Sequence, residues 1–357
     1  MAVKKKKSKL LIVIIIIIAF ILLVLGGLWI YLATPVSIGD KEGIEVEITS
    51  GTGTVEISKI LKDKGLIKSR ILFNIYVKTS GKKSLKADVY LLNKGMSLSE
   101  IVHELENGSD YNPLLVKLTF KEGKRVTDYA KLISENTNNS YDDVINFINN
   151  KEYVKTLINK YWFLTDKILD SDIYYPLEGY LAPDTYHFDN KDVKVEEIIT
   201  TMLDQEEKNL EKYKDKISSD PHKYITMASI VELEGTNTEN RKMIVGVFNN
   251  RLKANMNLGS DVTTYYGLQV AMTSDLTSEQ FNSNNKYNTR NPYMRGQLPI
   301  GPICNVDLSS IEASVNPTNN DYIYFVADKN GKIYYSKTLD EHNKKIKEIK
   351  DKGDWIW

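Results

Sequence analysis

Cysteine is almost absent from this chain of 357 residues, and several common chemical motifs are missing. The single cysteine, Cys304, cannot form an intrachain disulfide, so we expect it to be a small packing residue. None of the four histidines lies four residues from another and no H-E-x-x-H is present, which gives a zinc site little support. Neither G-x-S-x-G nor a P-loop occurs, and we therefore expect neither a metal nor a cofactor.

An excess of charge is also absent, because Lys and Arg number 47 and Asp and Glu number 47. A net charge of zero does not favour a nucleic-acid binder, and we expect no nucleic-acid partner. The charge is unevenly placed, however. Residues 1–9 hold five lysines and no acid, which leaves 42 basic and 47 acidic residues, a net charge of −5, over residues 10–357. With 42% apolar residues the chain can build a core, and its length suggests about two domains.

A long apolar run follows these lysines. Residues 10–32 form a stretch of 23 without a charge, and about 20 such residues span a bilayer as a helix. A cleaved signal peptide is the main alternative, but its apolar region usually covers only about 7–15 residues. Lysines before the run keep the N-terminus in the cytoplasm. We therefore predict a single-pass anchor in the cell membrane, with everything from about residue 34 extracytoplasmic.

The remaining chain divides into segments by composition and hydrophobic period. The predicted organisation is a basic cytoplasmic tail (1–9), a transmembrane helix (10–32), a stalk (33–43), a small module (44–112) and a larger domain (113–357). Alternation of apolar residues predicts strands over 44–48 and 116–120 and a hairpin over 322–336. Helical spacing predicts helices over 55–64, 97–105, 126–133, 144–158, 195–213 and 339–350. Because strands and helices mix without a βαβ rhythm, the expected class is α+β.

The segment 224–236, Y-I-T-M-A-S-I-V-E-L-E-G-T, joins an apolar helix to two carboxylates. Its middle is apolar on all sides, which is typical of a buried helix. Glu232 and Glu234 lie two residues apart and so point to opposite sides of that helix. Glu234 falls on the apolar stripe, where burial and the helix C-terminus both raise the pKa of a carboxyl group, as a general acid requires. The alternative is a solvated helix end, or an ion pair of Glu234 with Arg241 or Arg251.

Residues 229–234, S-I-V-E-L-E, resemble the S-I-[IV]-E-x-E signature of the endolytic murein transglycosylase, or YceG-like, family. A second block, 258–267, is similar to the family's L-Q-[ST]-D-P-T-V-x-Y-G, with Gly259 and Val262 as departures. Gly235 is a further departure, where a hydroxyl residue is common. The small module, 44–108, resembles the LysM-like subdomain of the same family. Further blocks match in order at 178–186, 247–252, 287–289, 298–302, 316–317, 324–327 and 342–343.

The resemblance implies an enzyme that cuts the MurNAc-β-1,4-GlcNAc bond of nascent peptidoglycan without water and limits glycan strand length. Glu234 is the residue that matches the catalytic glutamate. It would protonate the leaving oxygen and then accept the proton of the muramoyl 6-hydroxyl, which leaves a 1,6-anhydro end. One carboxyl group would thus serve both steps, unlike the usual pair of a glycosidase.

Other matched residues are candidates for substrate binding. Alternatives remain open: a helix cap for Asp261, a turn for Asn288, an ion pair for Arg251, and a scaffold role for the 178–186 block. The full set of candidates is Glu232, Asp261, Tyr287, Asn288, Thr289, Arg251, Glu178, Asp184 and Tyr186.

Two other functions compete with this interpretation. One is a non-catalytic scaffold that binds peptidoglycan and recruits cell-wall synthases. The other is a muramidase that cuts the same bond with water. For the transglycosylase the expected partners are glycan strands, the cell membrane, and peptidoglycan synthases together with the elongation and division machinery.

Overall fold

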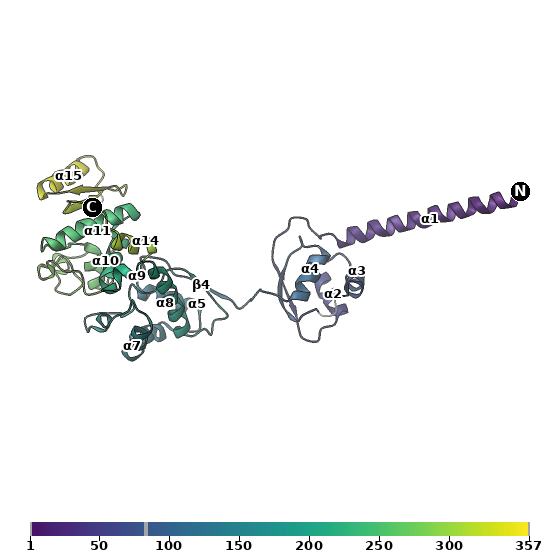
Figure 1. Ribbon diagram of the computed structural model, residues 1–357, viewed down its shortest axis with the longest axis horizontal. Helices are drawn as coiled ribbons and strands as arrows, with labels where there is room; N and C mark the ends of the chain where they lie inside the picture. Colours follow the sequence, from purple (N-terminus) through teal and green to yellow (C-terminus); the bar gives the residue numbers. More distant parts are fainter. Residues whose placement is uncertain (1, 82–84, 356–357) are drawn as a thin grey trace. The chain divides into compact units, whose positions relative to one another are not determined.

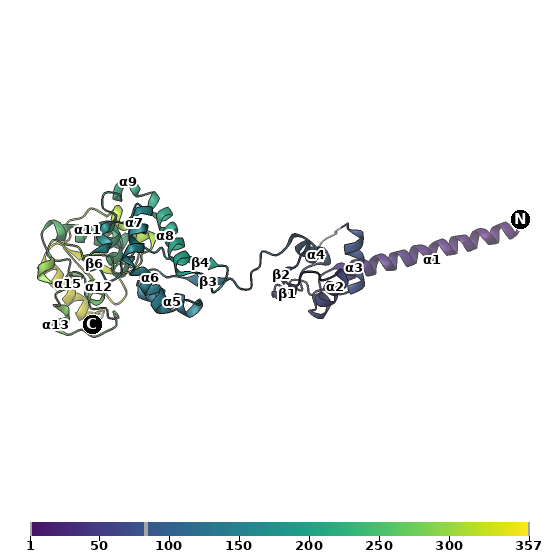
Figure 2. The same ribbon diagram turned by 90° about the horizontal axis from the view of Figure 1, so that it is seen from below.

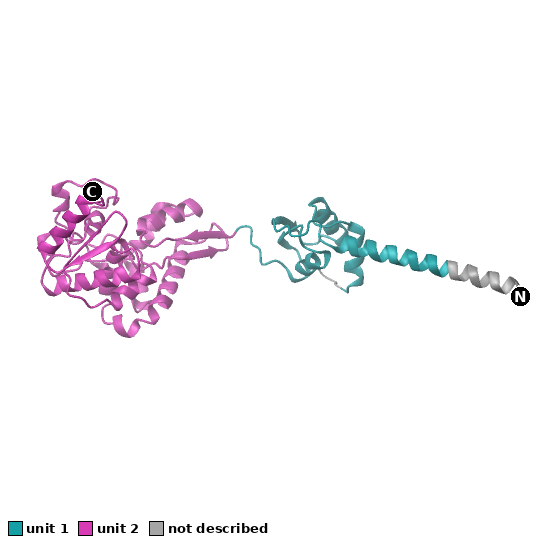
Figure 3. Cartoon of the chain, turned by 90° about the horizontal axis from the view of Figure 1, so that it is seen from above, with its two compact units in different colours: residues 1–114 teal, residues 115–357 magenta. Residues whose placement is uncertain are grey.

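The computed structural model describes residues 2–81 and 85–355 and divides the chain into two compact units, 1–114 and 115–357 (Figures 1 and 3). The division falls two residues beyond the predicted boundary at 112. Both units mix helices with short antiparallel strands, which confirms the α+β class. Each pair of strands among the described residues forms a separate two-stranded ribbon, and helices supply most of the core.

The first unit contains the apolar helix α1 and, after it, one ribbon and three further helices (Figure 2). In its first strand Val46 and Ile48 are buried, and Glu45 and Glu47, which alternate with them, are exposed, as the alternation predicted. Ser97 and Glu100 form the reciprocal capping box expected at the last helix of this unit. The sequence prediction missed the helix at Arg70–Thr79 and the strand at Asp88–Leu92. The elements are α1 (Ala2–Ala33), β1 (Ile44–Ile48), α2 (Thr54–Asp63), α3 (Arg70–Thr79), β2 (Asp88–Leu92) and α4 (Leu98–Asn107).

Helix α1 contains a segment, Ile14–Ala33, that is long and apolar enough to cross a membrane. Among the described residues it is the one such helix, and a membrane anchor and a signal sequence both fit it. The helix starts at Ala2, so the backbone of residues 2–9, in the predicted tail, is helical as well. The segment predicted as a stalk differs from an extended connection, because the amide of Ser37 donates to the carbonyl of Lys94 at 2.9 Å and holds the segment against the module.

The second unit carries the remaining elements. The strands pair as β3–β4 and β5–β6, and α15 packs on the second ribbon, as the predicted hairpin and final helix required. The elements are β3 (Val116–Thr119), α5 (Val126–Asn136), α6 (Tyr141–Ile148), α7 (Lys151–Lys160), η1 (Asp166–Leu169), β4 (Thr185–Phe188), α8 (Val195–Glu211), α9 (Lys214–Ile217), α10 (Pro221–Glu234), α11 (Thr238–Lys253), α12 (Asp261–Gly267), α13 (Ser278–Phe281), η2 (Pro292–Met294), α14 (Leu308–Val315), β5 (Tyr324–Ala327), β6 (Ile333–Ser336) and α15 (Leu339–Asp351).

One predicted helix, 144–158, is wrong as a single element. The chain forms α6 and α7 instead, and the break falls at Asn149 and Asn150. The side chain of Asn150 accepts a hydrogen bond from the amide of Tyr153 at 3.2 Å and caps α7. A side chain that satisfies a free backbone amide favours a new helix start over continuation of the old one.

Helix α10 lies between two hydrophobic clusters of the second unit. Ile225 and Ala228 belong to the cluster under α5–α8, whereas Ile230 and Val231 belong to the cluster around α11 and α12. Burial on both sides explains why this helix has no polar face. Cys304 is buried in the first of these clusters, as expected for a packing residue. The end of α10 is therefore held from both sides, which gives its last turn a fixed position.

Candidate active site

The two carboxylates at the end of α10 lie in different surroundings. The helix begins with a cap by Asp220 and a proline at its first position, and it ends at Gly235, whose backbone is extended. Glu232 and Glu234 point to opposite sides, as their spacing predicted, because residues two apart on a helix are about 200° apart around its axis. Different partners therefore surround the two groups.

Glu232 is 8% exposed and forms an ion pair with Arg241, whose Nη2 lies 2.8 Å from its Oε1. Its Oε2 accepts hydrogen bonds from the amide of Asp307 at 3.1 Å and the hydroxyl of Ser310 at 2.6 Å. These contacts join α10 to α11 and α14. The sequence analysis considered an ion pair between Glu234 and Arg241, but Arg241 pairs with Glu232 instead. Both carboxylate oxygens of Glu232 accept hydrogen bonds from other protein groups.

Glu234 is partly exposed, and its Oε1 accepts a hydrogen bond from Ser260 Oγ at 2.5 Å. Burial raises the pKa of Glu234 above its ordinary value of 4.5, and the nearby charge of Asp261 raises it further. The Ser260 hydrogen bond and the positive charge of Arg251 act in the opposite direction without cancelling the effect of burial. A carboxyl group that keeps its proton in this way can act as an acid.

A network of hydroxyl groups fixes Ser260. The amide of Ser260 donates to Thr289 Oγ1 at 3.1 Å, and its carbonyl accepts from Thr263 Oγ1 at 2.7 Å. The hydroxyls of Thr263 and Thr289 lie 2.8 Å apart, and all three residues are buried. Thr289, a predicted substrate residue, therefore lies behind the residue that contacts Glu234. The sequence prediction did not single out Ser260, although it stands directly before Asp261 in a matched block.

Asp261 is the first residue of α12, and Arg290 Nη1 contacts its carboxylate in a half-exposed ion pair. The cap position of this helix belongs to Ser260, whose side chain is directed to Glu234. Asp261 thus lies beside the candidate acid with an exposed edge. Arg290, which no motif singled out, adds a cation to this edge.

Tyr287 and Asn288 lie deeper in the protein. The Tyr287 ring is 1% exposed and packs against the rings of Tyr174 and Tyr266, with centroids 5.0 and 4.7 Å away. Asn288 is fully buried: its Nδ2 donates to two backbone carbonyls, and its Oδ1 accepts from Thr264 Oγ1 at 2.7 Å. These contacts favour the turn-holding alternative for Asn288.

The 178–186 block contributes mainly buried residues. Glu178 is buried. Its Oε1 accepts a hydrogen bond from the first amide of α5 at 3.0 Å, and its Oε2 accepts one from the hydroxyl of Tyr266 at 3.1 Å. Burial raises the pKa of Glu178 to about 8. The hydroxyl of Tyr186 donates to a backbone carbonyl at 2.9 Å, and Asp184 is exposed. This arrangement favours the scaffold alternative for the block.

Arg251 donates hydrogen bonds to backbone carbonyl groups and forms no ion pair with a carboxylate of the described residues. Its Nε donates to the carbonyl of Ile323 at 2.6 Å, its Nη1 contacts the carbonyl of Leu258, and the guanidinium lies over the Tyr324 ring. Gly259 follows with a φ of +65°, and a Cβ there would lie 3.2 Å from Nη1 of Arg251. The glycine that departs from the family pattern thus fits a left-handed turn against this arginine.

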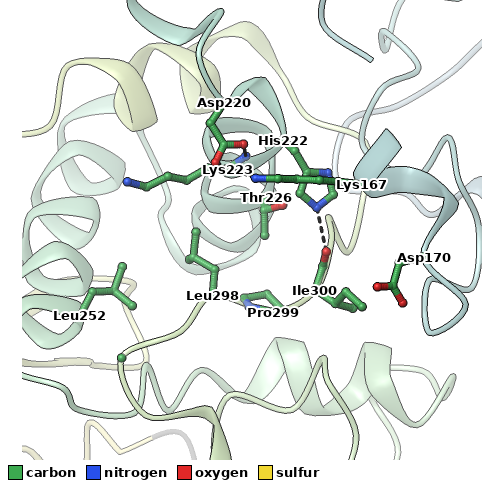
Figure 4. A pocket seen from close by; sticks show the side chains of 11 residues that line it. Lys167, Asp170, Asp220, His222, Lys223, Thr226, Leu252, Leu298, Pro299 and Ile300 are labelled. Carbon is green, nitrogen blue, oxygen red and sulfur yellow. Dashed lines mark hydrogen bonds and ion pairs between the residues drawn. The ribbon is translucent and has the colours of Figure 1, made fainter. Parts of the chain in front are cut away.

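Two cavities lie beside α10, one toward each end of the helix. The larger, about 500 Å³, lies at the N-terminal end, where His222 Nε2 is 2.7 Å from the carbonyl of Ile300 (Figure 4). The smaller, about 310 Å³, lies at the C-terminal end and is lined by Leu233 and Val262, the neighbours of Glu234 and Asp261. The two carboxylates themselves are not among the residues that line this cavity.

Comparison with known proteins places the chain in a family. Residues 46–348 match the model of the YceG-like family. The chain is 36% identical to the endolytic murein transglycosylase of Bacillus subtilis (strain 168), over 93% of each chain. It is 32% identical to that of Streptococcus pneumoniae serotype 2, over 88% of this chain and 60% of the relative. The crystal structure of a yceG-like protein of Listeria monocytogenes is 39% identical, with a TM-score of 0.60 over 85% of this chain and 99% of that one. The chain therefore belongs to the YceG-like family.

Proposed function

We propose that this protein is an endolytic transglycosylase that cleaves the MurNAc-β-1,4-GlcNAc bond of nascent peptidoglycan and leaves 1,6-anhydro-MurNAc ends. The names of its relatives in two species support this activity. The observation that carries the proposal is Glu234, a carboxyl group with a raised pKa that is partly exposed beside a cavity. The other carboxylate at the end of this helix, Glu232, forms an ion pair with Arg241.

The hydrogen bond from Ser260 determines how Glu234 would act. Because Ser260 donates to Oε1, the proton of the acid form resides on Oε2, which is the oxygen left for the glycosidic oxygen. Once Glu234 has given up this proton, the same hydrogen bond stabilises the carboxylate, since bonds to charged groups are the stronger ones. The carboxylate then accepts the proton of the muramoyl 6-hydroxyl as that oxygen attacks the anomeric carbon.

The surroundings of Glu234 fit a sugar ligand. Asp261 and Arg290 present exposed polar groups beside the acid, suited to hydroxyl and acetamido groups. The cavity of about 310 Å³ adds an apolar wall at Leu233 and Val262. A cleft that combines apolar surface with a few placed polar groups is the usual form of a ligand site. The buried residues Thr289, Asn288 and Glu178 would support this cleft from behind.

The first unit would keep the enzyme at its substrate. We assign α1 as the membrane anchor, with the N-terminus in the cytoplasm and the catalytic unit outside. The module at 44–108 would act as a LysM-like binder of glycan, and synthases of the cell wall would be its neighbours. A substrate made close to the membrane suits an enzyme whose module begins next to the end of its anchor.

Replacement of the acid tests this function. We expect Glu234→Gln to abolish the formation of anhydro ends on isolated glycan, because an amide cannot donate the required proton. Glycan binding and thermal unfolding should stay as in the wild type. Undiminished anhydro product from this variant would refute the assignment. Glycan binding without new ends from the wild-type protein would favour a scaffold instead.

A further inference from the structure

The end of α1 packs directly on the first module. Leu32 and Ala33 contact its hydrophobic core, and α1 contacts α3. Lys68, just before α3, donates through Nζ to the carbonyl of Tyr31 at 3.1 Å and to Thr34 Oγ1 at 2.8 Å. Its ammonium group also lies 4.2 Å from the centre of the Tyr31 ring. Helix α3 is therefore attached to the last turn of the apolar helix by core packing and by polar contacts.

The outer side of α3 carries large apolar residues that the module leaves uncovered. Ile71 is 74% exposed and Ile75 is 42% exposed, although Phe73 and Val77 of the same helix are buried. Residues four apart lie on one side of a helix, so Ile71 and Ile75 form a continuous stripe. Transfer of exposed isoleucine side chains from water to an apolar medium lowers their free energy.

Helices α3 and α4 carry charge of opposite sign, whereas α2 carries both signs. Helix α3 contains Arg70 and Lys78 and no acid, and Lys68 precedes it. Helix α4 contains three glutamates and no lysine or arginine. Isoleucines flanked by cations suit the interface of a bilayer with anionic headgroups, where apolar side chains enter the acyl boundary and basic groups stay at the headgroups.

We propose that Ile71 and Ile75 of α3 insert into the outer interface of the membrane in which α1 is anchored. The occupant of this surface is lipid, because α3 is attached at the place where the apolar helix would leave the bilayer. The inference depends on the anchor role assigned to α1 in the proposed function. The module would then be held at the bilayer by two contacts, the end of α1 and the isoleucines of α3.

Single-site labels in the full chain test the inference. An environment-sensitive fluorophore is placed at Ile71→Cys, at Glu104→Cys on α4 as an exposed control, and at Leu22→Cys in α1. The protein is reconstituted in vesicles of phosphatidylcholine and phosphatidylglycerol that contain a quencher lipid. The native Cys304 is buried, so unsubstituted protein serves as the labelling blank.

We expect the label at position 71 to be quenched about threefold more than the label at 104, with emission shifted to the blue. A label at 22 that is quenched and a label at 71 that is not would overturn the inference while the anchor stands. An unquenched label at 22 would overturn the anchor and the inference together. Adding Ile75→Asp should lower the quenching at 71, and unchanged quenching would contradict insertion of the stripe.

Discussion

At the scale of single residues, the hydroxyl of Ser260 controls the candidate acid. Its hydrogen bond to Glu234 Oε1 favours the carboxylate, so its removal in Ser260→Ala should raise the pKa of Glu234 further. Activity needs the protonated acid and falls as pH rises through this pKa. The falling limb of the pH–rate profile should therefore move to higher pH, and kcat should drop about tenfold because a hydrogen bond to a charged group is lost.

A conservative variant separates this role from simple folding. The family pattern accepts Ser or Thr at this position, so Ser260→Thr keeps the hydroxyl group. We expect it to restore the pH profile and most of kcat, with thermal unfolding close to the wild type. A profile in Ser260→Ala that does not shift would contradict the positioning role of this residue.

Glu232 should behave differently from Glu234. Removal of its carboxylate in Glu232→Ala leaves Arg241 with the Asp307 carboxylate at 3.3 Å as its remaining ion-pair partner and takes the acceptor from the buried hydroxyl of Ser310. Breaking a buried pair costs at most about 3–5 kcal/mol, and the remaining pair with Asp307 makes the expected loss smaller. Chemical unfolding should show this loss of free energy. Glu239→Ala, which removes an exposed carboxylate of neighbouring α11, should change stability little. Equal stability of the two variants would contradict a structural role for Glu232.

At the scale of elements, α8 carries an acid inside its apolar stripe. Glu206 is 2% exposed among the residues that pack under α5–α7, and burial raises the pKa of Glu206 to about 8. The folded state therefore keeps a proton that the unfolded state releases above its ordinary pKa of 4.5. Stability must fall as pH rises between these values, by at most about 1.4 kcal/mol per pH unit.

The variant Glu206→Gln should remove this part of the pH dependence. We expect it to be more stable than the wild type at pH 8 and to show a smaller loss between pH 5 and pH 8 in chemical unfolding. Glu178, with a pKa of about 8, acts in the same direction and leaves a residual slope. The exposed Glu211→Gln is the matched control. A wild-type slope in Glu206→Gln would contradict the burial argument.

The sequence predicted those elements whose signals come from residues close together in the chain. The apolar helix before Glu234, the capping box at Ser97 and the hairpin around Asn330 follow from residues close in the chain. Strand β4 was missed because its partner β3 lies far away in sequence. Ser260 was missed for the same reason, since its contact with Glu234 spans 26 positions and no local period reports it.

At the scale of the whole molecule, the zero net charge separates into a basic N-terminus and an acidic remainder. The family match at 46–348 includes most of both units, so both units are part of the region that the family model describes. In the candidate site the cation of Arg290 is paired with the carboxylate of Asp261, which weakens its long-range attraction for an anionic wall polymer. Recognition of glycan should then rest on short-range contacts.

Salt dependence of glycan binding tests this view. We expect the Kd of the full chain for uncrosslinked glycan to change less than about threefold between low and high salt, because neutral contacts are not screened. Inulin or another neutral polysaccharide is the control for non-specific association. A steep loss of affinity with salt would show that long-range attraction dominates.

The mass of the product tests the central claim most directly. Purified, uncrosslinked glycan is digested with the full chain in water enriched in heavy oxygen, and the new ends are analysed by mass spectrometry. A transglycosylase uses the muramoyl 6-hydroxyl, so we predict anhydro ends without solvent oxygen. Ends that are heavier by one water and carry the heavy isotope would show hydrolysis and contradict the mechanism assigned to Glu234.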